Sequence, residues 1–354
     1  MDGTFRDGVV HLSGNARQRF YDSGGYGRPA GGNDIELAPV EAAYLLYRDD
    51  LDAVVDETGD SGHAGGAGGA RMGFREFLTR TDAVLAFVVY KDLRDRGFYL
   101  SPAREGWVDD GIDDETDFVV YPRGKGPSDD EIAYRLRVVG ERAPLSAASI
   151  DGHMLAVVDE DGELTYFGTE WLSPSGSADP DLPESLDATL MDDRLLVWDP
   201  PETLYEGGFF GQRLAGRNAD SGPLQLSLLE AAYLAERGAL GMDVDSVSSH
   251  AEAIEGERFG RRYAAYRSLR AAGVVPKSGF KFGADFRVYE AFDGVSDLGH
   301  SDKLVRVVEP DHEFLPRELS LDVRLAGGVR KRMVFALTEP TDAVDWLCVE
   351  RITP

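Results

Sequence analysis

Three residues in the C-terminal half of the chain, Tyr289, His300 and Lys331, have side chains that together can cleave RNA. A tyrosine near cations accepts a proton, a histidine donates one, and a lysine stabilises charge on a phosphate. Acting together, they would direct a ribose 2′-hydroxyl onto the adjacent phosphorus. Ionising a free tyrosine at neutral pH costs about 4 kcal/mol, because its pKa is about 10. We therefore expect cations such as Lys331, Arg287 or Lys303 close to Tyr289.

The elements that must position these side chains occur twice. Residues 36–48 read ELAPVEAAYLLYR and residues 225–237 read QLSLLEAAYLAER, and both have the apolar spacing of a helix. Residues 88–100 resemble residues 264–276, and each stretch predicts a second helix that ends at a glycine. The N-terminal residues of each copy are also alike, since YDSGGYG in the first resembles YEGGFFG in the second.

Three alternating segments follow the helices in each copy and predict strands. The aligned segments are 116–121 with 284–289, 132–139 with 301–308, and 152–160 with 331–339. All matches come in the same order with similar spacing, which indicates duplication of a unit of about 170 residues. We predict an α+β fold of two tandem repeats, each with an N-terminal α/β subdomain and a C-terminal nuclease-like mixed-sheet subdomain.

The predicted boundaries place a structural repeat at 1–172, a linker rich in Ser, Pro and Asp at 173–184, and a catalytic repeat at 185–354. The glycine-rich residues 57–72 predict a flexible insertion in the first repeat. They do not form a phosphate-binding loop, because they lack a GK[ST] ending and a following helix signal.

Duplication provides an internal control, because positions needed for folding should be alike in both copies. The aligned pairs are Tyr289 with Tyr121, His300 with Glu131 and Lys331 with Gly152. The second copy alone therefore has a tyrosine, a histidine and a lysine at these three positions. The tyrosine occurs in both copies, which supports a structural part of its role.

The chain is strongly acidic, with 37 Lys and Arg against 64 Asp and Glu and a formal net charge of -27. Acidity spread along the whole chain is typical of a protein that works in molar salt, and a merely acidic mesophilic protein is the alternative. A nucleic-acid partner is still possible, since the Debye length at 1 M salt is about 3 Å and net charge has little reach. An RNA-binding protein would then depend on shape, stacking and a few close arginine contacts.

A single cysteine, Cys348, rules out an internal disulfide and favours a cytoplasmic protein. The sequence has no run of eighteen apolar residues and no signal-peptide pattern at its start, so we expect no membrane partner.

Three stretches of the second repeat resemble the archaeal tRNA-splicing (tRNA-intron) endonucleases at that family's spacing. They are YRSLRAAGVVPKSGFKFGADFRVYE at 266–290, GHSDKLVRVV at 299–308 and VRKRMVFAL at 329–337. The resemblance is specific from about residue 224 to residue 354 and weaker but continuous in the first repeat. The arrangement resembles the fused-repeat homodimers of the family, in which one repeat is catalytic and the other is structural.

The resemblance implies that Tyr289 is the general base on the 2′-hydroxyl, that His300 protonates the leaving 5′-oxygen, and that Lys331 stabilises the phosphorane. The implied products are a 2′,3′-cyclic phosphate and a 5′-hydroxyl, without a metal or another cofactor. The implied partner is precursor tRNA, cut at the bulge-helix-bulge of its exon–intron junctions, and no DNA partner is expected. The implied assembly is a homodimer.

The resemblance also implies two binding features. Arg324 and Arg351 match arginines that stack on a flipped bulge base. An acidic loop at 159–163 matches a loop that docks in a partner subunit, and the corresponding loop at 339–345 is less acidic. The acidic docking residues are Asp159, Glu160, Asp161 and Glu163.

Each of these residues also has an ordinary structural explanation: packing at a strand edge for Tyr289, a surface or N-cap position for His300, and a solvated basic position for Lys331. Two other functions compete with the one above. A metal-dependent nuclease usually has an acidic residue two positions before a lysine, and none of the six lysines has one. A non-catalytic RNA-binding or structural subunit fits the first repeat, but the second repeat has the complete set of three residues.

Overall fold

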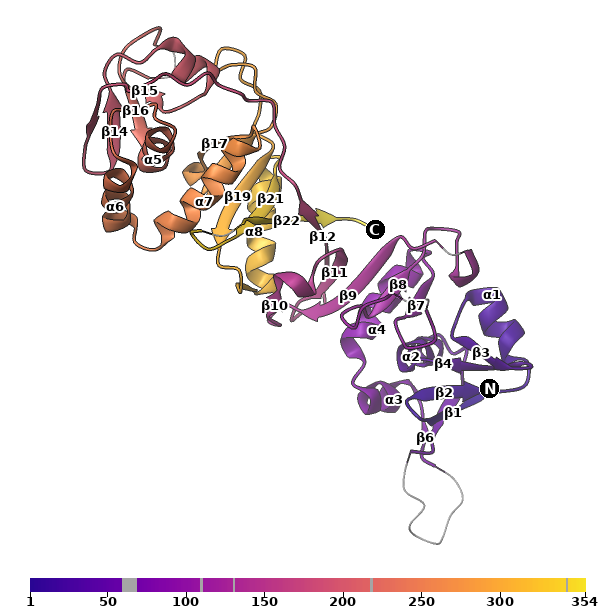
Figure 1. Ribbon diagram of the computed structural model, residues 1–354. Helices are drawn as coiled ribbons and strands as arrows, with labels where there is room; N and C mark the ends of the chain where they lie inside the picture. The colour runs from indigo at the N-terminus through magenta and orange to yellow at the C-terminus, as the bar shows by residue number, and fades with distance from the viewer. Residues whose placement is uncertain (59–68, 109–110, 130, 217–218, 342) are drawn as a thin grey trace.

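A ten-stranded sheet runs through the whole computed structural model and joins two lobes, one per repeat (Figure 1). The structure describes residues 1–354 except 59–68, 109–110, 130, 217–218 and 342. Most of the predicted insertion at 57–72 therefore lies outside the described residues. Helices and mixed sheets alternate in both lobes, which confirms the predicted α+β class.

The first repeat begins with a six-stranded mixed sheet of order β3-β4-β2-β1-β5-β6, on which helix α2 packs. The elements are β1 (Asp2–Arg6), β2 (Val9–Leu12), η1 (Arg17–Tyr21), α1 (Asp22–Gly24), β3 (Arg28–Gly31), β4 (Asp34–Leu37), α2 (Pro39–Tyr47), β5 (Ala53–Asp56), β6 (Arg71–Met72) and α3 (Phe74–Thr81). Helix α2 begins at a proline in its first turn, where the missing N–H is not needed.

The C-terminal subdomain of the first repeat is a five-stranded part of the long sheet, with helix α4 against it. Its elements are α4 (Val84–Asp95), β7 (Leu100–Pro102), β8 (Phe118–Val120), η2 (Pro127–Asp129), β9 (Tyr134–Gly140), β10 (Leu145–Ser146), η3 (Ala147–Ser149), β11 (His153–Val158) and β12 (Leu164–Leu172).

The second repeat follows the same plan, with a smaller N-terminal sheet of order β13-β14-β16-β15. Its N-terminal elements are β13 (Ala188–Leu190), β14 (Arg194–Val197), η4 (Thr203–Gly207), β15 (Gln212–Arg213), β16 (Leu224–Ser227), α5 (Leu228–Glu236) and α6 (Val244–Glu255). Its C-terminal elements are α7 (Arg258–Ala271), β17 (Val275–Ser278), η5 (Phe280–Phe282), β18 (Phe286–Tyr289), β19 (Lys303–Val308), β20 (Glu313–Phe314), α8 (Pro316–Gly328), β21 (Arg332–Leu337) and β22 (Asp345–Ile352).

The long sheet has the order β17-β18-β19-β21-β22-β12-β11-β9-β8-β7, so each half is the other half in reverse. The halves meet at β12 and β22, which pair antiparallel from Tyr166 opposite Ile352 to Leu172 opposite Trp346. One buried core cluster includes Phe167 of the first repeat together with α8 and the strands beside it. The repeats therefore share a core, and the division at 172–185 stays a prediction.

The predicted linker lies along the second repeat. Strand β12 ends at Leu172, and the backbone N–H of Gly176 donates to the carbonyl of Ala272 at 2.8 Å. The N–H of Ser177 donates to the carbonyl of Glu290 at 3.0 Å. These bonds hold the segment beside the C-terminal end of α7 and the residue that follows β18.

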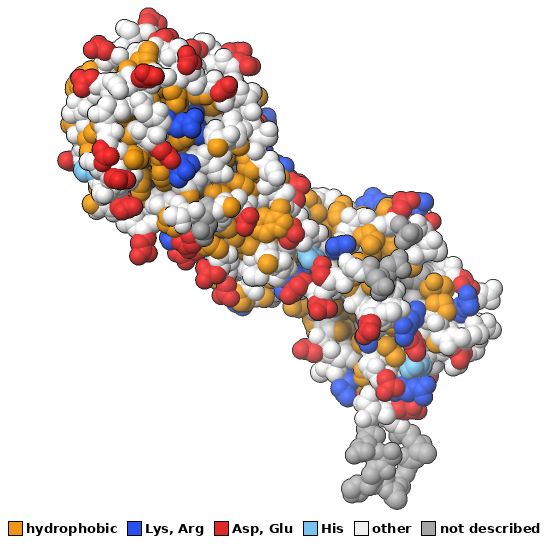
Figure 2. All heavy atoms as spheres, in the orientation of Figure 1, with side chains coloured by type: hydrophobic (Ala, Val, Ile, Leu, Met, Phe, Trp, Pro, Cys, Tyr) orange, Lys and Arg blue, Asp and Glu red, His pale blue; other side chains and the backbone are white. Residues whose placement is uncertain are grey.

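Acidic side chains are scattered over both lobes on the face seen in Figure 2. Within the described part of the chain, no helix is long and apolar enough to cross a membrane.

Candidate active site

The ends of three neighbouring strands meet at one edge of the sheet in the second repeat. Strand β18 runs antiparallel to β19, with Val288 opposite Lys303, and β19 runs parallel to β21, with Lys303 opposite Arg332. The C-terminal end of β18 and the N-terminal ends of β19 and β21 therefore lie side by side. Tyr289 is the last residue of β18, and Lys331 immediately precedes β21.

His300 lies in the segment that leads into β19. A hydrogen bond from Lys331 to this segment brings the lysine close to the histidine. The Lys331 ammonium donates a hydrogen bond to the carbonyl oxygen of Ser301, the residue after His300. The N–H of Asp302 donates to the carbonyl of Val288 at 3.0 Å. The structure thus gathers the backbone positions of the three predicted residues at this edge of the sheet.

Tyr289 is buried, whereas His300 is exposed to solvent. The centroid of the Tyr289 ring lies 6.0 Å from that of Phe209, and Phe209 stacks on Phe292 at 6.1 Å. Phe209 belongs to the N-terminal subdomain, so the tyrosine is fixed where the two subdomains of the repeat meet. Such aromatic pairs contribute about 0.5–1.5 kcal/mol beyond the area that they bury.

Phe209 has a strained backbone, with φ at 49° in the left-handed region that favours glycine. The equivalent residue of the first repeat is Gly25, with φ at 62°. A non-glycine residue in this region costs of order 1–3 kcal/mol and persists where its surroundings require it. The strained residue therefore lies directly beside Tyr289.

Among the three cations expected near Tyr289, Lys303 is already paired, because its ammonium lies 2.5 Å from a carboxylate oxygen of Glu290. Burial lowers the pKa of the Lys331 ammonium, the Asp302 carboxylate opposes that change, and the Arg287 guanidinium adds to it. Arg287 thus lies near enough to Lys331 for their charges to interact.

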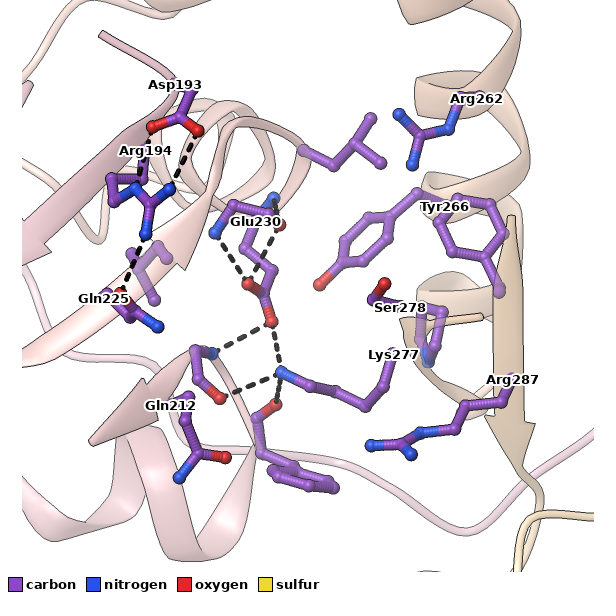
Figure 3. A pocket seen from close by; sticks show the side chains of 17 residues that line it. Asp193, Arg194, Gln212, Gln225, Glu230, Arg262, Tyr266, Lys277, Ser278 and Arg287 are labelled. Carbon is purple, nitrogen blue, oxygen red and sulfur yellow. Dashed lines mark hydrogen bonds and ion pairs between the residues drawn. The ribbon is translucent and has the colours of Figure 1, made fainter. Parts of the chain in front are cut away.

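A cavity of about 400 Å³ opens between the two subdomains, lined by residues of β15, β16 and α5 on one side and of α7, β17 and β18 on the other (Figure 3). The Lys277 ammonium donates to a carboxylate oxygen of Glu230 at 2.6 Å and to the carbonyls of Phe209 and Gly211 at 3.0 Å each. Burial alone would raise the pKa of Glu230, but the charge and hydrogen bond of Lys277 hold that pKa below its ordinary value.

Glu230 also fixes the start of helix α5. Its carboxylate accepts the N–H of Ser227 at 2.9 Å, and the Ser227 hydroxyl accepts the N–H of Glu230 at 3.3 Å, which forms a capping box. One buried carboxylate therefore ties together α5, the loop that contains Phe209 and strand β17.

The first repeat has the same buried carboxylate without the lysine. Glu41 accepts the N–H groups of Gly27 at 2.7 Å and Ala38 at 2.9 Å, and Ser101 stands at the position of Lys277. Burial raises the pKa of Glu41 to about 7, against 4.5 for a free glutamate.

The two predicted stacking arginines lie on α8 and β22 and are exposed. The register that pairs Met333 with Val349, extended by two residues, places Arg351 opposite Lys331 at the same edge of the sheet. Arg324 lies on α8, which packs against β21. Within the described ranges, neither guanidinium has a hydrogen-bond or ion-pair partner, so both are available to a ligand.

The acidic loop is the exposed tip of the β11–β12 hairpin. The Asp159 carboxylate accepts the N–H groups of Asp161 at 3.0 Å and Glu163 at 2.8 Å, which fixes the turn. The side chains of Asp161 and Glu163 extend from this exposed turn, whereas the Glu160 carboxylate forms an ion pair with Arg142 of the same chain.

Sequence reasoning missed Phe209, Lys277 and Glu230. Comparing the repeats would have found two of them, because Phe209 aligns with Gly25 and Lys277 with Ser101. Glu230 escaped notice because it belongs to a helical pattern that both repeats share. In the described parts of the chain, no group of three or more His, Cys, Asp or Glu side chains could hold a metal ion.

Comparison with known families gives two matches. Residues 1–61 and 186–249 match the tRNA intron endonuclease N-terminal domain. Residues 259–346 match the tRNA intron endonuclease catalytic C-terminal domain. The N-terminal domain thus matches once in each repeat, and the catalytic match covers the sheet edge described above.

Curated relatives match over the whole chain. The tRNA-splicing endonuclease of Haloferax volcanii is 62% identical over 356 aligned residues, with all of both chains covered. That of Halobacterium salinarum is 52% identical over 360 residues, again with full coverage. That of Methanococcoides burtonii is 37% identical over 367 residues, with 97% of each chain covered.

Proposed function

The chain belongs to the tRNA intron endonuclease family, and from this premise we propose that it cuts precursor tRNA at the bulge-helix-bulge of exon–intron junctions. Membership of a family of RNA endonucleases sets aside the non-catalytic alternative. The relatives from Haloferax volcanii and Halobacterium salinarum match over their full length and are haloarchaeal, in keeping with the net charge of -27.

In the proposed reaction, Tyr289 removes the proton of the 2′-hydroxyl, and the 2′-oxygen attacks the adjacent phosphorus. His300 donates its proton to the 5′-oxygen as the phosphorus–oxygen bond breaks, and Lys331 stabilises the charge on the phosphorane. The products are a 2′,3′-cyclic phosphate and a 5′-hydroxyl, and the two proton transfers balance. No step in this scheme calls for a metal.

The observation that carries the proposal is the shared edge of β18, β19 and β21, where Lys331 is hydrogen-bonded to the residue beside His300. The exposed His300 can reach a leaving group in solvent, while the buried Tyr289 is held by Phe209. Arg351, at the same edge, and Arg324, on α8, would stack on a flipped base. Stacking and cation–π contacts suit a cell with molar salt, because they are less screened than distant charges.

We further propose a homodimer in which the acidic loop at 159–163 docks on the partner subunit. The exposed carboxylates of Asp161 and Glu163 at this hairpin tip would pair with a cationic surface, and close contact is required because charge attraction has a reach of only about 3 Å in 1 M salt. Two catalytic repeats in one dimer would supply one site for each bulge.

Incubation of the protein with an intron-containing precursor tRNA in molar KCl and EDTA tests this function directly. We expect cleavage at both junctions, with 2′,3′-cyclic phosphate and 5′-hydroxyl ends. Loss of all cutting in EDTA, restored by Mg²⁺, would instead support metal-dependent chemistry. Gel filtration in the same salt tests the dimer, and an active monomer would contradict it.

A further inference from the structure

Arg287 is a cation that lacks a protein partner in the described structure. It lies on β18, two residues before Tyr289, and is half buried. Its Nε is buried without a hydrogen-bond partner. Figure 3 shows its guanidinium extending into the cavity beside Lys277, and no dashed line reaches it.

The fold gains nothing from this charge. Arg287 lies directly opposite Lys277 across the β17–β18 pair, and like charges in this arrangement are unfavourable. Lys277 is compensated by Glu230, whereas Arg287 is not. A half-buried strand position that serves only packing favours an apolar residue, so the arginine needs another explanation.

The first repeat supplies that apolar residue. Val119 occupies the equivalent place, directly opposite Ser101 on β7. The hydroxyl of Tyr121, the equivalent of Tyr289, donates to the hydroxyl of Ser101 at 3.0 Å. The repeat without the histidine and lysine of the active site therefore also lacks this arginine, and its sheet forms without it.

The position of Arg287 relates it to the reaction. Its charge acts on Lys331, so an anion between the two would be stabilised by both. The Phe209 ring lies 4.7 Å below the Lys277 ammonium and 6.0 Å from the Tyr289 ring, which places the cavity next to the tyrosine. Arg287 thus lines this cavity from the same strand as Tyr289, two residues before it.

We propose that Arg287 binds a backbone phosphate of the RNA next to the scissile phosphodiester, which rests on the function proposed above. A guanidinium presents a planar fork that matches two phosphate oxygens, and charge-assisted bonds of this kind are short and strong. A half-buried contact also keeps its strength in molar salt, where surface charges are screened. The carboxylates of a partner's acidic loop are the competing ligand, but they would not explain the position of the arginine beside Tyr289 and Lys331.

The test compares RNA binding by His300→Ala, in which we expect much slower cutting, with that of the double variant His300→Ala/Arg287→Val. The valine copies Val119 and suits a strand. Binding of a fluorescent bulge-helix-bulge RNA is measured by anisotropy over a range of KCl concentrations. The control is Arg135→Val in the same background, which removes one exposed arginine from β9 of the first repeat.

We expect Arg287→Val to weaken binding about 10- to 100-fold, the loss of one charged hydrogen-bond pair. The slope of log affinity against log salt should fall by roughly 0.7–0.9, because one phosphate contact is lost. Arg287→Lys should restore the slope but only part of the affinity, since an ammonium lacks the fork. The Arg135→Val control should change neither the affinity for the RNA nor the slope of log affinity against log salt.

Unchanged affinity and slope for Arg287→Val would overturn the inference while the proposed function stands. Unchanged RNA binding together with a weaker dimer on sedimentation would assign Arg287 to the partner's acidic loop instead. If His300→Ala fails to bind the bulged RNA and the parent protein fails to cut it, the proposed function falls and the inference falls with it.

Discussion

Replacing Lys277 by the residue of the first repeat, as Lys277→Ser, is predicted to destabilise the protein strongly above neutral pH and much less below pH 5. The substitution removes the ammonium that lies 2.6 Å from Glu230 and leaves a buried carboxylate without its cation. The first repeat already shows the result of this arrangement, since Glu41 is buried without such a lysine and burial raises its pKa to about 7.

The expected loss of folding stability in Lys277→Ser follows from comparing Glu230 with Glu41. Without Lys277, the pKa of Glu230 should rise toward that of Glu41, about 7, from the unfolded value of 4.5. The gap between these values corresponds to about 3 kcal/mol, within the range of about 3–5 kcal/mol for breaking a buried ion pair. A pKa raised in the folded state adds stability below pH 4.5 that is lost as the pH rises through 7. The variant should therefore be about 3 kcal/mol less stable at pH 8 than at pH 5, relative to the parent.

Thermal and denaturant unfolding, followed by circular dichroism in molar KCl, measures the free energy of unfolding of variant and parent at pH 5 and at pH 8. Lys281→Ser, which changes an exposed lysine of η5, is the matched control and should change stability by less than about 0.5 kcal/mol. A loss below about 1 kcal/mol at pH 8, or equal losses at both pH values, would refute the reasoning about the buried pair.

Three further predictions use the same features. Ser101→Lys should give Glu41 a cation and reduce the loss of stability between pH 5 and pH 8 by up to about 3 kcal/mol; a pH profile identical to that of the parent would contradict this. Arg351→Ala should weaken binding of the bulged RNA about 10-fold or more, with little dependence on KCl, because stacking on a base contributes about 1–3 kcal/mol; a strongly salt-dependent loss would indicate a phosphate contact instead. Neutralising the loop at 159–163 with Asn and Gln should raise the dimer dissociation constant measured by sedimentation, and an unchanged constant would remove the loop from the interface.

The duplicated pattern predicted most of the architecture. The segments aligned by sequence became equivalent strands, and β7, β8, β9, β11 and β12 lie in the same order from the edge to the junction as β17, β18, β19, β21 and β22. Local periodicity was sufficient to predict these strands, because apolar and polar residues alternate along them as in half-buried strands. The position of His300 and Lys331 before β19 and β21 also followed from that alignment.

Other features could not be predicted from local patterns. The pairing of β12 with β22 joins strands far apart in the chain, and alternation specifies a strand but not its partner. Phe209 adopts a glycine-like backbone that its residue type does not suggest. Asp285 is a buried carboxylate that pairs with Arg258 and Arg262 of α7, and only the packing of α7 on the sheet reveals these partners.

The central claim is that His300 donates the proton to the leaving oxygen at an edge shared with Tyr289 and Lys331. The most direct test is the single-turnover cleavage rate of His300→Ala on precursor tRNA in molar KCl and EDTA, with RNA affinity measured on the same preparation. We expect a rate about 10²- to 10⁴-fold below that of the parent, with RNA affinity changed little. A rate equal to that of the parent would contradict the central claim.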